Sequence, residues 1–448
     1  MSHGPIQAQP DAMRLCLFGL LCCAFTLLLY ARLPSLPFPF EYAEGDTVLW
    51  AQQWRASVDV YAAHDDLPLL RSNYPPLYLA LMAALARGDD TLLLVGRLLS
   101  LAGFSLALAC AGFVAARASG ARAAGVLSGL LLVALAQVSL WGVTCRPDGL
   151  GLGFGVLGLT LVALQVRGAW ALAGLSFAVA LLCKHSLLVL PLGAGLWTLR
   201  RSRPRALGLA LSTALPFLGA LFAFVGFSRG RLAALLDMLL LGSAAPVSGL
   251  TLVLNLLVLG PPLAPLLWLA LRPVTAGSRG ASNADPTLLG PFRVSLLVGL
   301  CWSAALARIG AAGNHLLELS VCAAVLAPCA AFATGRPGRL RLLLGVAALA
   351  SAILAAQLLG SDVPLRRAQA QTAAAALAGV RGLVLCEQSF HALQHRQAVI
   401  PFLATQQARM GRWDPKPLVS AIADSRIEPV VLGSPLDRPA TFGSERIP

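Results

Sequence analysis

Apolar runs of about one membrane thickness recur along most of the chain, and they constrain its fold more than any other feature. Crossing a bilayer takes about 20 apolar residues in a helix, whose backbone groups bond to one another. About eleven such runs occur: residues 15–31, 92–115, 123–141, 149–165, 170–183, 187–199, 206–227, 252–271, 294–307, 316–333 and 342–359. Charged residues make up 12% of the 448 residues, about half the share of a soluble domain. The sequence predicts an all-α polytopic membrane protein, without the alternating pattern of an outer-membrane barrel.

The positive charge follows the order of these spans. The net charge is +14, which in a soluble protein would suggest nucleic acid. Here the arginines gather in short clusters between alternate spans, as the positive-inside rule requires: Arg117, Arg122, Arg167, Arg200, Arg201, Arg203, Arg205, Arg272, Arg336, Arg339 and Arg341. We therefore expect no nucleic-acid partner. We expect a multi-pass protein of a bacterial inner membrane with a cytoplasmic N-terminus.

Two patterns that could suggest other chemistry are explained by the spans. The ten cysteines lie mostly inside apolar runs and form no CxxC pair, so they predict neither a zinc site nor a disulfide framework. Residues 153–158 spell G-x-G-x-x-G, but no strand precedes them and they lie within a span. These glycines favour close helix packing over dinucleotide binding.

The predicted organisation is a transmembrane domain over residues 1–359 and a small tail over residues 360–448. A large polar first loop, residues 32–91, follows the first span. Within it we expect a helix over residues 47–56 with Asp46 as its cap, and a short interfacial helix over residues 77–86. In the tail, strands over 380–386 and 427–432 with helices over 402–410 and 418–425 predict a soluble α/β domain. The odd number of spans places this tail outside, with the first loop.

Acidic residues gather in the first loop, and other ionisable or polar residues stand at the outer ends of later spans. The loop carries Glu41, Glu44, Asp46, Asp59, Asp65 and Asp66 and closes with Asn73-Tyr74-Pro75-Pro76. The later positions are Arg146, Asp148, Lys184, His185, Arg308, Asn314, His315 and Glu318. Ionisable groups at membrane depth are costly and mark functional sites. Cations there suit a phosphate, and carboxylates suit proton abstraction or a metal.

Each of these positions also has a purely structural interpretation. Pro147 and Asp148 can simply start a helix, although that leaves Arg146 unexplained. Lys184 can extend its ammonium to the membrane interface. Glu318 can pair with Arg308. For Glu44, which stands just beyond the first membrane exit, we identify no structural task.

Several short motifs resemble those of GT-C-type glycosyltransferases. Glu44-Gly45-Asp46 followed by Asn73-Tyr74-Pro75-Pro76-Leu77-Tyr78 resembles the first outer loop of bacterial polyprenyl-phosphate-dependent enzymes. These include the lipid A aminoarabinose transferases and the protein O-mannosyltransferases. Further similar motifs are Arg146–Leu150, Leu182–His185, Gly313–Glu318 and Gly411–Asp414. The resemblance covers nearly the whole chain, although each motif is short.

The resemblance implies a membrane glycosyltransferase that takes a sugar from a polyprenyl-phosphate carrier at the outer face and passes it to a glycan, lipid or protein acceptor. Glu44, or Asp46 as second choice, would be the catalytic carboxylate. The other motif positions would form the substrate and phosphate site: Tyr74, Arg146, Asp148, Lys184, His185, Asn314, His315 and Glu318. Many relatives have adjacent Asp-Glu, whereas Gly45 separates the acids here. This leaves open which acid is the base and whether a divalent cation, Mg²⁺ or Mn²⁺, takes part.

The competing class is a multi-span transporter or flippase of lipid or polysaccharide. Such proteins have Gly- or Pro-broken spans with charges near the membrane midplane. Here the charges gather at one face, which favours chemistry at that face.

Overall fold

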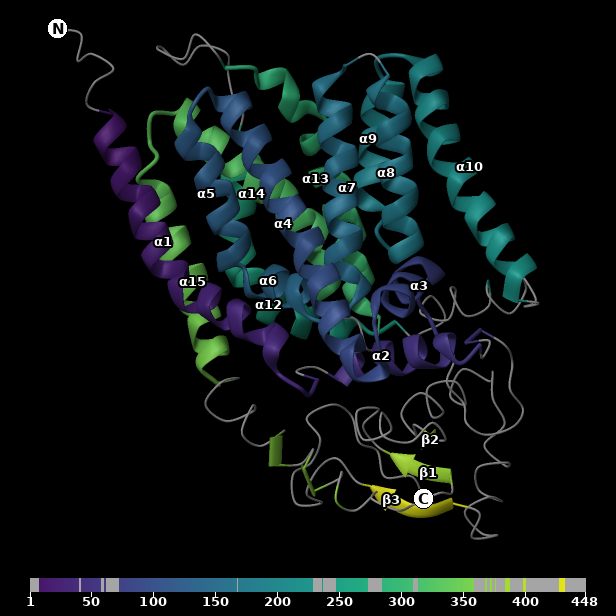
Figure 1. Cartoon of the computed structure of the whole chain (residues 1–448). Helices are drawn as coiled ribbons and strands as arrows, with labels where there is room; N and C mark the ends of the chain where they lie inside the picture. The colour runs from purple at the N-terminus through teal and green to yellow at the C-terminus, as the bar shows by residue number, and fades with distance from the viewer. Residues whose placement is uncertain are drawn as a thin grey trace, which may run out of the picture.

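The computed structural model describes the helical part of the chain almost completely. The described residues are 8–39, 42–57, 60–61, 72–166, 168–228, 236, 247–272, 284–308, 313–357, 367–368, 371–372, 375, 383–386, 398–399 and 427–431. Within them the chain forms a bundle of long helices with short helices across one end (Figure 1). Glu41, Asp59, Asp65, Asp66 and the tail motif 411–414 lie outside the described residues.

The long helices follow the predicted spans. They are α1 (Ala8–Arg32), α4 (Leu92–Ser119), α5 (Arg122–Ala134), α7 (Pro147–Leu164), α8 (Ala169–Cys183), α9 (Val189–Leu199), α10 (Arg203–Ser228), α12 (Gly249–Ala270), α13 (Leu289–Trp302), α14 (Leu317–Ala333) and α15 (Arg339–Gln357). Six helices in the described residues are long and apolar enough to cross a membrane. This confirms the polytopic helical fold, while the count of eleven spans stays a prediction.

Two predicted elements differ in detail. The span over residues 123–141 is two helices, α5 and α6 (Ala136–Val143), because Leu135 between them has an extended backbone. The prediction that Asp46 caps a helix is wrong, since α2 (Tyr42–Arg55) begins four residues earlier and contains Asp46 in its second turn. The short helix predicted over residues 77–86 is confirmed as α3 (Pro76–Leu85), with Pro76 as its first residue, while its position at the membrane interface stays a prediction.

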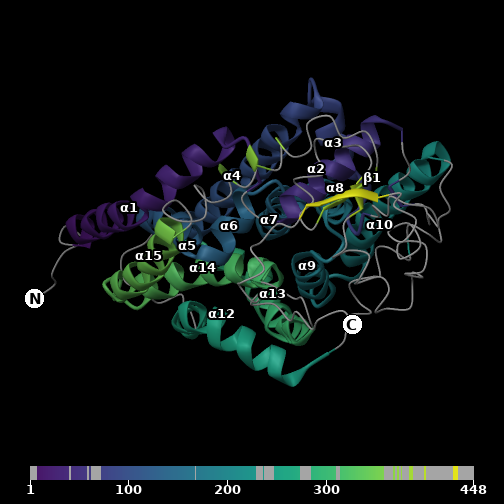
Figure 2. The ribbon, with the colours of Figure 1, turned by 90° about the horizontal axis from the view of Figure 1, so that it is seen from below.

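The bundle has a clear centre. The apolar window of α14 is 89% buried inside the molecule, whereas those of α10 and α12 are only 11% buried. Seen from below, α7 and α14 lie between α1 and α15 on one side and α10 on the other (Figure 2). The exposed apolar faces of α10 and α12 suit contact with lipid chains.

Glycines let α4 and α7 approach closely, as residues 153–158 predicted. A Cβ on Gly153 would lie 2.2 Å from the carbonyl oxygen of Gly103, and one on Gly103 would lie 2.3 Å from the Cα of Leu150. A side chain at either position would force the two helices apart. Such close approach of small residues is how helices associate in membranes without a hydrophobic driving force between them.

One end of the bundle, which we call the α2 end, carries the short helices α2, α3 and α6 (Figure 1). The helix α15 also ends there, because its Ser351 donates to the carbonyl oxygen of Ala134 at the end of α5. The described helices of the first loop and the end of α15, which precedes the tail in sequence, therefore lie at one end of the molecule.

In the tail the structure describes a three-stranded parallel sheet in the order β2-β1-β3. The strands are β1 (Leu383–Cys386), β2 (Ala398–Val399) and β3 (Ile427–Val431). β1 and β3 fall within the predicted strands, while the predicted helices over 402–410 and 418–425 lie outside the described residues. The separate soluble domain therefore stays a prediction.

Which side of the membrane the α2 end faces is testable. We expect alkaline phosphatase fused after Ser361 to be active and green fluorescent protein fused there to be dark, because the arginine clusters lie at the opposite end of the bundle. Paired alkaline phosphatase and green fluorescent protein fusions would measure this. A fusion after Ser202 serves as the cytoplasmic control, and a cytoplasmic signal from the Ser361 fusion would reverse the assigned topology.

Candidate active site

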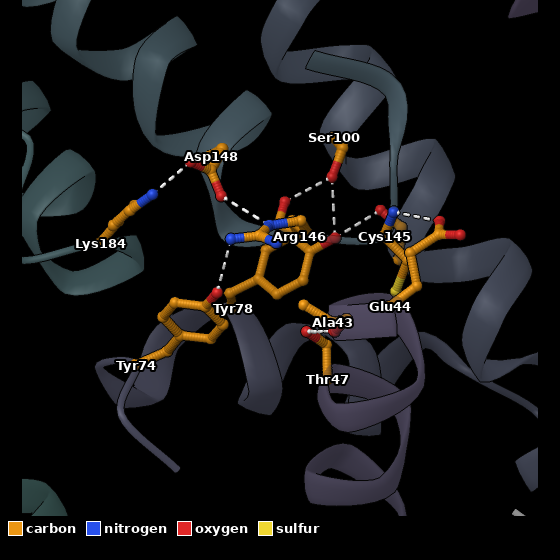
Figure 3. Close-up of polar contacts among 11 residues, drawn as sticks. Ala43, Glu44, Thr47, Tyr74, Tyr78, Ser100, Cys145, Arg146, Asp148 and Lys184 are labelled. Carbon is orange, nitrogen blue, oxygen red and sulfur yellow. Dashed lines mark hydrogen bonds and ion pairs between the residues drawn. The ribbon is translucent and has the colours of Figure 1, made fainter. Parts of the chain in front are cut away.

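At the α2 end, a network of buried polar side chains runs from Lys184 to Glu44 (Figure 3). It joins α2, the segment before α3, α4, the α6–α7 connection and the α8–α9 connection. These elements are far apart in sequence, so the predicted site residues are brought together only by the fold. Figure 3 shows Lys184 and Glu44 at opposite ends of the network, with Arg146 and Tyr78 between them.

The first part of the network is a trio of charged residues. Arg146 immediately precedes α7, and Asp148 lies in the first turn of α7 because Pro147 is its first residue. The Nε of Arg146 donates to Asp148 at 3.2 Å, and the Nζ of Lys184 donates to the other oxygen of the same carboxylate. All three side chains are buried. One carboxylate thus joins two cations, and three of the predicted site residues lie together.

The guanidinium of Arg146 has two further contacts. Its Nη2 donates to the hydroxyl of Tyr74 at 3.0 Å, and its Cζ lies 4.3 Å from the centre of the Trp141 ring. Tyr74 in turn packs edge-to-face on Trp50 of α2, with 5.7 Å between ring centres. The planar Arg146 is therefore fixed between α6 and the segment before α3, which joins the predicted Tyr74 to the site.

The backbone of this region is held by hydroxyl groups. Ser100 of α4 donates to the carbonyl oxygen of Arg146 at 2.7 Å and lies 2.8 Å from the hydroxyl of Tyr78. The Tyr78 hydroxyl also donates to the carbonyl oxygen of Gly96 at 2.6 Å. The start of α7 is thus tied to both α3 and α4.

Glu44 has a structural task that its sequence position does not reveal. Arg97 of α4 donates to both of its oxygens at 2.9 Å, and the backbone N–H of Cys145 donates to Oε1 at 2.6 Å. Arg97 also donates to the carbonyl oxygens of Leu36 and Phe38. Both charged side chains are fully buried. Glu44 therefore fastens α2 to α4 and to the peptide just before Arg146, while its role as base stays a prediction.

Asn314, His315 and Glu318 come from the segment that leads into α14. His315 lies in the short helix η6 (Gly313–Leu316), which packs against α6, the helix that holds Trp141 beside Arg146. Glu318 accepts the backbone N–H groups of Val189 and Leu190, and these partners replace the pairing with Arg308 that the sequence left open. Three further observations concern the remaining predicted residues. Asn314 Oδ1 is buried without a hydrogen-bond partner in the described part of the chain, His185 is half-buried beside Lys184, and Asp46 is buried on α2.

The charged trio contains more cations than carboxylates. Two cationic side chains, Arg146 and Lys184, meet at one carboxylate, Asp148. Burial lowers the pKa of Lys184 below its ordinary value, while the Asp148 charge opposes this shift. Two buried cationic side chains in one place are typical of a site for an anionic group such as a phosphate.

The described residues offer no ready site for a divalent cation. No group of three or more His, Cys, Asp or Glu side chains comes together within them. Glu44 and Asp148, the two acids of the drawn network, are each engaged by cationic side chains. We therefore derive no step through a metal ion.

Sequence reasoning missed Arg97 and Trp141. Arg97 is the only charged residue within the apolar run over residues 92–115, and an ionisable residue inside a span is itself a functional signal. That signal could have identified Arg97, though not its partner. Trp141 lies at the end of a predicted span, where an aromatic residue is common and carries no special signal.

Comparison with known proteins identifies the fold. No family model matches the chain, and no curated protein matches it. Among solved structures, ArnT from Cupriavidus metallidurans bound to undecaprenyl phosphate is similar, with 16% identity, a TM-score of 0.62 and coverage of 90% of each chain. The same protein in the apo state matches with 17% identity, a TM-score of 0.59 and coverage of 90% of each chain. The chain therefore has the fold of these ArnT structures over nearly its whole length.

Proposed function

We propose that the chain is a membrane glycosyltransferase that takes a sugar from a polyprenyl-phosphate carrier and transfers it to an acceptor at the α2 end. The observation that carries this proposal is the buried trio in which two cationic side chains, Arg146 and Lys184, meet at the carboxylate of Asp148. The ArnT fold supports it, because one of the ArnT structures contains undecaprenyl phosphate. The acceptor is a hydroxyl group of a glycan, lipid or protein.

The phosphate of the carrier would bind to Arg146 and Lys184, with His315 beside them. Guanidinium and ammonium groups form strong charge-assisted hydrogen bonds to phosphate oxygens. The contact of Arg146 with Trp141 and Tyr74 fixes its plane in advance, which reduces the entropy lost on binding. The apolar surfaces of the surrounding bundle suit the prenyl chain.

The transfer also needs a base for the acceptor hydroxyl, and we assign this role to Asp46 rather than Glu44. Both oxygens of Glu44 already accept hydrogen bonds from its ion-pair partner Arg97, and one of them also accepts the backbone N–H of Cys145. Asp46 is the other acid of the motif and lies two residues further along α2. A general base must come within about 3 Å of the proton it removes. As the hydroxyl oxygen attacks the anomeric carbon, its proton passes to Asp46 and the carrier phosphate leaves with the bonding electrons.

A flippase would use the same lipid without transferring the sugar. The charges of the site gather at one end of the bundle and not at its middle, which favours transfer over transport. Incubation of purified protein with polyprenyl-phosphate-linked sugars extracted from bacterial membranes separates the two. A transferase converts them to free polyprenyl phosphate when acceptor is present, whereas a flippase leaves them intact.

Binding of the carrier is the direct test of the phosphate site. We expect Lys184→Ala to weaken binding of undecaprenyl phosphate roughly ten- to a hundredfold, because a hydrogen bond to a charged group contributes about 1.5–3 kcal/mol. Wild-type affinity should also fall as salt is raised. Titration of purified protein in detergent, followed by intrinsic tryptophan fluorescence, measures both effects.

Arg201→Ala is the matched control for this experiment. Arg201 also stacks on a tryptophan, Trp197, at 4.4 Å, but it follows the end of α9 that lies away from Lys184. Its removal should leave undecaprenyl phosphate affinity unchanged. Equal affinities for wild type and Lys184→Ala would show that Lys184 only anchors the chain at the membrane interface.

A further inference from the structure

Glu318 makes an unusual contact between two parts of the site. It lies in the first turn of α14, yet its two oxygens accept the N–H groups of Leu190 at 2.9 Å and Val189 at 3.2 Å, the first residues of α9. The start of α9 has no side-chain cap of its own. The first N–H groups of a helix need acceptors, and a carboxylate there is favoured by the helix dipole. Glu318 thus caps a helix 128 residues away in the sequence.

This cap fixes the short connection that carries Lys184. The connection runs from the end of α8 at Cys183 to the start of α9 at Val189. At its first end, the N–H of Lys184 bonds to the carbonyl oxygen of Ala180 and so continues α8. At its second end, Glu318 holds the first N–H groups of α9. The position of Lys184 therefore depends on both ends of a five-residue segment.

The segment at the start of α14 that carries Glu318 also carries His315, three residues earlier in the sequence. The short helix η6 (Gly313–Leu316) leads directly into α14 and packs against α6, which holds Trp141 beneath Arg146. Glu318 is also near enough to influence the charge of Lys184. One side chain thus connects the segment of Lys184 with the segment of His315.

We propose that Glu318 is a positioning residue that holds Lys184 against Asp148, and so keeps the phosphate site assembled before the carrier binds. This inference rests on the proposed function for the identity of the anion, a polyprenyl phosphate. The positioning itself can be measured without any carrier, because Lys184 is one of only two lysines in the chain, with Lys416 as the other.

The experiment measures the reactivity of each lysine in the full-length protein. Purified protein in detergent is treated with a water-soluble N-hydroxysuccinimide ester at fixed pH, and labelling of the two lysine-containing peptides is followed by mass spectrometry. In wild type, Lys184 should react slowly because it is buried and paired with Asp148. In Glu318→Ala we expect its rate, relative to Lys416, to rise about tenfold or more, since two hydrogen bonds to a carboxylate are lost.

A conservative variant separates positioning from simple loss of charge. Glu318→Gln keeps one acceptor oxygen for the start of α9 and removes the negative charge, so Lys184 should react at an intermediate rate. If Glu318→Ala does not fold, the Glu318→Gln variant is used for the test in its place. Asp285→Ala is the matched control, because Asp285 caps the short helix η4 (Pro286–Leu288) beside the far end of α4. It should leave Lys184 reactivity unchanged.

Three results would decide the proposal. Slow labelling of Lys184 in both folded Glu318 variants, equal to wild type, overturns it. Equal acceleration in Glu318→Ala and Glu318→Gln also overturns it, because the charge alone would then matter. The expected graded acceleration, with a parallel loss of undecaprenyl phosphate affinity, supports it. If labelling changes as expected but the wild type binds no undecaprenyl phosphate, the proposed function fails while the positioning of Lys184 stands.

Discussion

Replacing Asp46 by Asn is expected to lower the rate of sugar transfer by about 10²–10⁴, the usual contribution of a general base. The substitution keeps the size of the side chain and removes its capacity to accept the acceptor's proton. Binding of undecaprenyl phosphate should stay within about threefold of wild type, because its charge partners are Arg146 and Lys184. The measurement is release of polyprenyl phosphate from extracted lipid-linked sugars, with carrier binding measured in parallel.

Glu44→Gln is the companion variant, and it distinguishes the two acids of the motif. If Glu44 only fastens α2 to Arg97, its loss should lower the thermal unfolding temperature more than Asp46→Asn does. Full turnover by Asp46→Asn, together with loss of turnover by a folded Glu44→Gln, would restore Glu44 as the base. That outcome would require the Arg97 contact to open when the acceptor binds.

Most of the helical architecture could be predicted because its cause is local. An apolar run long enough to cross a bilayer has one stable solution, a helix, so the predicted spans match the observed helices closely. The break at Leu135 was not predictable, because neither glycine nor proline marks it and the extended backbone is set by its surroundings. The early start of α2 has a similar origin, since Ala43 and Glu44 are buried by packing that the sequence does not show.

Part of the candidate site could also be predicted from local features of the sequence. Arg146, Asp148 and Lys184 each stand at the end of a span, where a buried charge needs an explanation, so their grouping followed from topology alone. Ion pairs between residues far apart in the sequence could not be predicted in this way. Glu44 and Arg97 are 53 residues apart, and nothing in either segment indicates the other. A carboxylate that looks free in a sequence can therefore be a structural ion pair in the fold.

The ion pair of Arg97 and Glu44 should be among the largest single contributions to stability in the described part of the chain. Arg97→Ala removes the cation that pairs with the buried Glu44 carboxylate, and it also removes the donors for the carbonyl oxygens of Leu36 and Phe38. Breaking one side of a buried pair costs about 3–5 kcal/mol. We expect that loss in the free energy of unfolding, measured by denaturant titration in a mild detergent.

The neighbouring pair of Arg55 and Asp89 provides the control for this last prediction. It lies at the same end of the bundle, with an Nε–Oδ1 distance of 3.3 Å, but its side chains are 27% and 33% exposed. Arg55→Ala should therefore cost only about 1 kcal/mol or less. The double variant Arg97→Met with Glu44→Gln should be more stable than Arg97→Ala, because no unpaired charge is left buried. Equal losses in Arg97→Ala and Arg55→Ala would mean that water reaches Glu44, and the acid would again be accessible to an acceptor hydroxyl.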